Sequence, residues 1–66
     1  MTGREVEAVR KKAGMGMAEF GIALGYPGTT RTIERKIRRA ESGGRAPVSA
    51  ALAERVRAFV ATDKRR

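Results

Sequence analysis

The chain has 66 residues, enough for one small domain, and it contains neither cysteine nor histidine. These absences exclude disulfides, thiolate metal sites and cysteine nucleophiles, and they remove the commonest metal ligand and general base. Lysine and arginine number 15 against 7 acidic residues, so the net charge is +8 and a polyanion such as nucleic acid is the expected partner.

The first helix is predicted over about residues 3–13. Thr2 and Glu5 have the spacing of a capping box, in which the threonine hydroxyl accepts a backbone hydrogen bond and the glutamate reaches back to the cap. Apolar residues then follow at helical spacing: Val6, Val9 and Ala13. Arg10 is expected on a wetter side of this helix, and Gly14 offers a left-handed stop.

A short second helix is predicted from Met17, with an apolar stripe formed by Met17, Phe20 and Leu24. Gly25 is expected to end it, because residues 25–28 combine two glycines with a proline and so predict a turn. Ile22 lies off the stripe and is expected to be exposed incidentally, whereas Met15 and Met17 are expected to fill gaps in the core.

The third helix is predicted over about residues 29–42 and runs through the sequence TRTIERKIRRAES. Thr29 or Thr30 can cap its beginning, because a threonine oxygen accepts hydrogen bonds from the first backbone amides. The glycine pair at 43–44 is expected to end it.

The two sides of this third helix differ sharply in composition. On a helical wheel Ile37 and Ala40 lie close beside Ile33, which predicts a buried side. Four arginines lie opposite: Arg31, Arg35, Arg38 and Arg39. Only Glu34 and Glu41 are expected to dilute this positive charge.

A final helix is predicted from about Ser49 to Thr62, after a linker at 45–47. Four of its apolar residues are expected to face the core: Leu52, Val56, Phe59 and Val60. For Phe59 and Val60 a dimer seam remains an open alternative. No segment alternates like a strand that could build a sheet. The sequence therefore predicts an all-α, compact four-helix domain over residues 1–62, followed by a basic disordered tail at 63–66.

The second and third helices, over about residues 17–42, have the pattern of a helix-turn-helix unit. In such a unit one helix braces across the DNA backbone while the next enters the major groove. Arginine suits that groove because its planar fork can bind guanine O6 and N7 together. The arginine-rich side of the third helix therefore favours binding to duplex DNA.

Segments 17–26 (MAEFGIALGY) and 41–47 (ESGGRAP) together resemble the Cro and phage-repressor-like helix-turn-helix family, also called the XRE family. The resemblance covers roughly residues 2–60 and is carried by Phe20, Gly21, Leu24, Gly25, Glu41, Ser42, Gly43, Arg45 and Pro47. It implies a lambda-repressor-type fold in which a side chain at Gly21 would push the third helix away. Two features differ from the family: Gly16 and Met17 replace a small polar cap and a glutamine that touches phosphate, and the turn after Gly25 is longer.

The N-terminal half of a recognition helix probes the groove most deeply. The candidates for base-edge contacts are therefore Thr30, Arg31, Thr32 and Arg35. The candidates for phosphate contacts are Thr29, Lys36, Arg38, Arg39 and Arg45. Phosphate contacts set affinity and register without specifying sequence.

These features together predict a transcriptional regulator that binds double-stranded DNA as a homodimer, because two half-sites multiply specificity. The resemblance implies a repressor, of bacterial or phage origin. No catalytic site, metal site or cofactor is expected. The first residues lack a secretory signal pattern and no apolar run approaches the roughly 20 residues of a membrane span, so a cytoplasmic, nucleoid-associated protein is expected.

Other functions remain open at this point. A DNA-binding antitoxin or accessory subunit would have the same fold but would mainly hold a protein partner. A basic amphipathic protein acting on membranes belongs to another class, and its helices would form only on lipid. RNA binding is disfavoured because Phe20, Tyr26 and Phe59 offer no platform for stacking unpaired bases.

Overall fold

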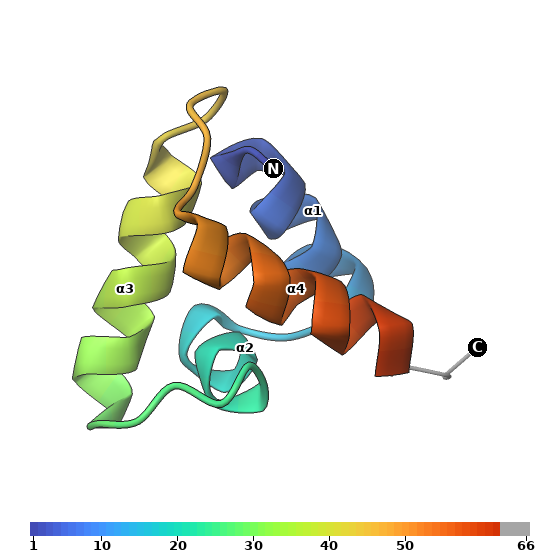
Figure 1. The fold of residues 1–66 in the computed structure, drawn as a ribbon. Coiled ribbons are helices and arrows are strands. Elements are labelled where there is room, and N and C mark those ends of the chain that lie inside the picture. The colour runs from blue at the N-terminus through green and yellow to red at the C-terminus, as the bar shows by residue number, and fades with distance from the viewer. Residues whose placement is uncertain (63–66) are drawn as a thin grey trace.

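The structure is a computed structural model, and it describes residues 1–62 of the chain. This part contains four helices joined by short connections (Figure 1). They are α1 (Gly3–Ala13), α2 (Met17–Ala23), α3 (Thr30–Ser42) and α4 (Ala50–Thr62). The all-α, four-helix prediction is therefore confirmed, and the only strand-like pairing within these residues is an isolated bridge between Thr2 and Pro47. The tail predicted at 63–66 lies outside the described residues.

Local capping signals account for both ends of α1. The Thr2 hydroxyl oxygen accepts a hydrogen bond from the Glu5 backbone N–H at 3.3 Å, and the Thr2 backbone N–H donates to Glu5 Oε1 at 2.8 Å. This is the predicted capping box. At the other end Gly14 has φ +74°, a left-handed conformation that suits glycine.

A single apolar cluster joins the four helices. Its fully buried side chains are Val6, Phe20, Ile37 and Val56. Phe59 of α4 packs edge-on against Phe20, with the ring centroids 5.3 Å apart and the planes at 85°. Met15 and Met17 are half-buried against the cluster, as predicted.

The prediction that Val60 faces the core is wrong, because its side chain is 52% exposed. Phe59 takes the core position at this level of α4, and the next residue points about 100° away around a helix. Ile22 is exposed, as expected.

Helices α2 and α3 pack closely because Gly21 has no side chain. A Cβ atom at Gly21 would overlap Ile33 Cγ2 and would lie 3.2 Å from Ile37 Cγ1. A larger residue would therefore force Ile33 or α3 itself to shift, in the sense that the resemblance implied for this position. The glycine sets how far α3 stands from the rest of the domain.

A buried ion pair joins α1 to the end of α3. Arg10 donates from Nε to Glu41 Oε2 at 2.6 Å and from Nη2 to Glu41 Oε1 at 3.0 Å, and the two side chains are only 12% and 5% exposed. The expectations of a wet Arg10 and of a Glu41 that dilutes the surface charge are both wrong. The hydrogen bond to Glu41 raises the pKa of Arg10 above its usual value. Arg10 also donates to the Met15 carbonyl at 3.0 Å, so one guanidinium links α1, α3 and the segment that leads into α2.

Candidate nucleic-acid interface

Helix α3 begins at a threonine cap. The Thr29 side-chain oxygen accepts a hydrogen bond from the Thr32 backbone N–H at 3.2 Å, and the Thr29 hydroxyl donates to the Thr32 hydroxyl oxygen at 2.9 Å. Thr29 is therefore the cap, and Thr30 is the first residue of the helix. The structure brings these three candidate contacts together at one end of α3.

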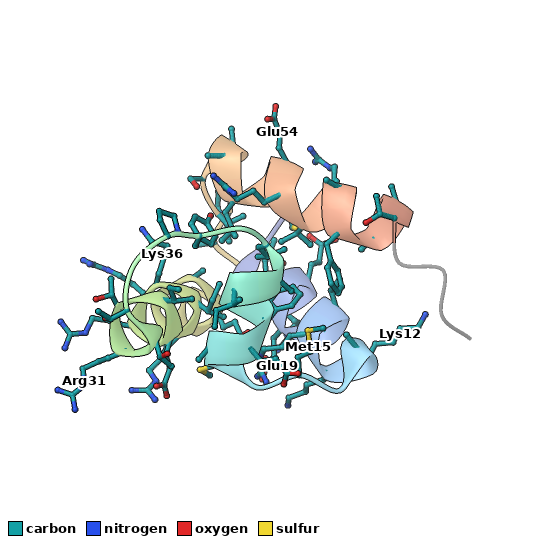
Figure 2. All side chains as sticks on the ribbon, turned by 90° about the horizontal axis from the view of Figure 1, so that it is seen from below. Lys12, Met15, Glu19, Arg31, Lys36 and Glu54 are labelled. Carbon is teal, nitrogen blue, oxygen red and sulfur yellow. The ribbon has the colours of Figure 1, made fainter. Side chains whose placement is uncertain are left out.

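The two sides of α3 differ as the wheel predicted. Ile33 and Ile37 are 2% and 0% exposed and pack inward. All the cationic side chains of the helix are exposed: Arg31, Arg35, Lys36, Arg38 and Arg39. Figure 2 shows Arg31 directed away from the body of the domain. One side of the helix holds the fold, and the other is accessible to a ligand.

An acidic neighbour occupies only one flank of the exposed side. Arg38 donates to Glu34 at 2.9 Å, one helical turn away. The other four cations make no ion pair with any group in residues 1–62. We call these four the cationic face: Arg31, Arg35, Lys36 and Arg39. Binding of a phosphate by Arg38 would have to compete with Glu34, whereas the cationic face needs no such exchange.

The long turn between α2 and α3 is held from α4, which the sequence did not predict. Arg55 donates to the Leu24 carbonyl at 2.9 Å, and its guanidinium carbon lies 4.5 Å from the centroid of the Tyr26 ring. Lys36 Nζ lies 5.3 Å from the same centroid. No spacing signal could have identified this contact, because Arg55 and Leu24 are 31 residues apart. It couples the turn that precedes α3 to a helix that follows it.

Arg45 lies apart from the other candidates, in the loop between α3 and α4. The first residues of the chain hold this loop: the Arg4 N–H donates to the Gly44 carbonyl and the Val48 N–H to the Met1 carbonyl, both at 2.9 Å. Figure 1 shows the loop at the opposite end of α3 from the α2–α3 turn. Since 13 helical residues span about 20 Å, Arg45 can meet only a different part of a ligand from that met by the start of α3.

In the described part of the chain, no group of three or more metal-ligating side chains lies together. No helix of residues 1–62 has both the length and the apolar character needed to cross a membrane. Comparisons with protein-family models, with curated proteins and with solved structures find no significant match.

Proposed function

We propose that this chain binds duplex DNA by placing α3 in the major groove, and that it regulates transcription by occupying its site, as a repressor does. The observation that carries the proposal is the division of α3 into a buried apolar side and an exposed side with five cationic residues. A major groove, about 12 Å wide, admits one helix whose outer side chains reach the base edges. On this proposal the protein acts in the cytoplasm, on the nucleoid.

The proposed contacts fall into two groups along α3. Residues in its first half read base edges: Thr30, Arg31, Thr32 and Arg35. Residues around them, and in the next loop, hold phosphates: Thr29, Lys36, Arg38, Arg39 and Arg45. The first group supplies specificity and the second supplies affinity and register.

We further propose that two copies bind together. One recognition helix of 13 residues covers a short stretch of DNA, whereas a symmetric dimer places two such helices in successive major grooves about 34 Å apart. Because each half-site adds its own discrimination, the pair specifies a site that one copy cannot.

Selection of tight-binding sequences from a pool of random duplexes tests this function. We expect enrichment of one sequence with two-fold symmetry, because a dimer reads the same half-site twice. A pool that shows no enrichment would contradict specific regulation. Single-stranded DNA, duplex RNA and anionic vesicles serve as competitors, and any of them that competes better than the selected duplex would also overturn the proposal.

The salt dependence of binding then locates the phosphate contacts. Each neutralised phosphate steepens the log–log dependence of affinity on salt by about 0.9, so Arg39→Gln is expected to flatten the slope by about that amount. Lys12→Gln removes the same charge from the end of α1, which Figure 2 shows on the opposite side of the molecule from Arg31, and should leave the slope nearly unchanged. Equal effects of the two substitutions would mean that overall charge, not α3, attracts the DNA.

A further inference from the structure

A groove of about 560 Å³ lies between α3 and the beginning of α4. Three residues of the cationic face form one wall: Arg35, Lys36 and Arg39. Figure 2 shows Lys36 on the side of α3 that faces α4.

Most of the other residues that line the groove are apolar or small, and its polar ones, Thr32, Ser49 and Tyr26, carry hydroxyl groups. The aliphatic side chains among them include Ala40, Pro47, Val48, Ala51 and Leu52. Duplex DNA does not explain this surface, because the edge of a duplex presents charged phosphates and sugars, which gain little from contact with aliphatic side chains. The groove therefore matches a ligand that carries apolar groups as well as negative charge.

The charge around the groove indicates which ligand that is. None of its lining residues is acidic, and its three cations make no ion pair within residues 1–62. A second copy of this chain complements these cations poorly, because its lysines and arginines outnumber its acidic residues by 15 to 7, so the groove is not assigned to the interface of the proposed dimer. An acidic polypeptide segment with apolar anchors complements both the cations and the aliphatic lining residues.

We propose that the α3–α4 groove binds an acidic, leucine-containing segment of a partner protein, and that this segment displaces DNA from α3. The docking follows from the groove itself, whereas the displacement rests on the proposed DNA binding. The two ligands exclude each other because Arg35 and Arg39 are shared between them. The partner would act as an antagonist of DNA binding.

A synthetic peptide tests the docking directly. The probe is a short fluorescein-labelled peptide of glutamates with leucines at i and i+4, followed by fluorescence anisotropy on the full chain. We expect saturable binding that weakens about tenfold or more when the leucines are replaced by serine, because their burial is lost. Replacement of the glutamates by glutamine should weaken it similarly. If either control peptide binds as well as the probe, the proposal is wrong.

A substitution inside the groove separates docking from simple charge attraction. Ala51→Gln fills the groove from an exposed position outside the core, without changing charge, and should weaken the peptide about tenfold while leaving DNA affinity nearly unchanged. Ala58→Gln makes the same change at an exposed position of α4 outside the groove and should leave both unchanged. The proposal would be overturned if Ala51→Gln left peptide binding unaffected. It would also be overturned if the chain self-associated and Ala51→Gln dissociated it, because a second copy would then occupy the groove.

Competition between peptide and DNA completes the test. Unlabelled peptide should release the selected duplex at concentrations near its own dissociation constant. If the peptide fails to bind while DNA binds, the groove proposal falls and the proposed function stands. If the peptide binds and no duplex does, the docking stands and the proposed function falls. Simultaneous binding of both ligands would overturn the displacement.

Discussion

Helix α3 carries charge in two regions that behave in opposite ways. At its inner end the Glu41 carboxylate is 5% exposed and is paired with Arg10 through two hydrogen bonds. On its outer side Arg31, Arg35 and Arg39 are exposed and make no ion pair within the described residues. Both regions carry ionised side chains, but their burial and their partners differ: a buried, partnered charge holds α3 in place, and exposed cations remain available to a ligand.

The largest expected effect comes from breaking the buried pair. Arg10→Met leaves the Glu41 carboxylate buried without its partner, and it also removes the hydrogen bond to the Met15 carbonyl. We expect the free energy of unfolding to fall by about 3–5 kcal/mol, since an uncompensated buried charge is costly. Urea unfolding followed by circular dichroism measures the change.

The double substitution Arg10→Met with Glu41→Leu is the matched control. Replacing both charges by apolar groups of similar size is often neutral, so most of the lost stability should return. If Arg10→Met alone lowers the free energy of unfolding by less than about 1 kcal/mol, the pair contributes no more than an ordinary surface ion pair. The contrast between the two regions would then not hold.

The outer region should respond in the opposite sense. Arg35→Ala is expected to leave the free energy of unfolding within about 0.5 kcal/mol, because the side chain is exposed and packs on nothing in the core. The binding free energy of the Arg35→Ala variant for the selected duplex should weaken by about 1–3 kcal/mol if the guanidinium makes a bidentate base contact. Anisotropy titrations with the selected duplex and with a random duplex measure both effects.

Lys12→Ala controls for the loss of one positive charge at a distance from α3. If Arg35→Ala weakens binding to the selected and the random duplex equally, Arg35 contacts a phosphate rather than a base edge. A loss of stability as large as that of Arg10→Met would show that the outer region also holds the fold.

The same contrast explains how much the sequence could predict. The limits of α3 depend on neighbouring residues: the sequence predicts a cap at Thr29 or Thr30 and an end at the glycines at 43–44, and the structure has the cap at Thr29 and the end at Ser42. The inward direction of Ile33 and Ile37 followed from helical periodicity and is confirmed. The exposed side of α3 was predictable for the same reason, because exposure is the complement of a local pattern.

The contacts that position α3 were not predictable in the same way. Arg10 and Glu41 are 31 residues apart, and so are Arg55 and Leu24. Such pairs depend on how the helices cross, which local spacing does not encode. One signal was available for Glu41: it lies about 80° from Ile33 on the wheel, on the same side as Ile37, which favours burial over the exposed position that was predicted.

The smallest expected effect concerns an exposed carboxylate that does hold the fold, and so sharpens the contrast between buried and exposed charges. Glu5 is exposed, yet the hydrogen bond from the Thr2 backbone N–H lowers the pKa of its carboxyl below the usual 4.5. A carboxyl whose pKa is lowered in the folded state stabilises the fold at pH values above its unfolded-state pKa. That stabilisation is lost as the pH falls through the folded-state pKa.

Glu5→Gln should therefore lower the melting temperature slightly at pH 7, and the difference from the unchanged chain should shrink as the pH falls below about 4.5, because a protonated glutamate resembles glutamine. Melting curves of both chains across this range measure the difference, and high salt should not abolish it, since a short hydrogen bond is screened less than a distant charge. A difference that stays constant from neutral to acid pH would mean that the carboxylate charge contributes nothing to the cap.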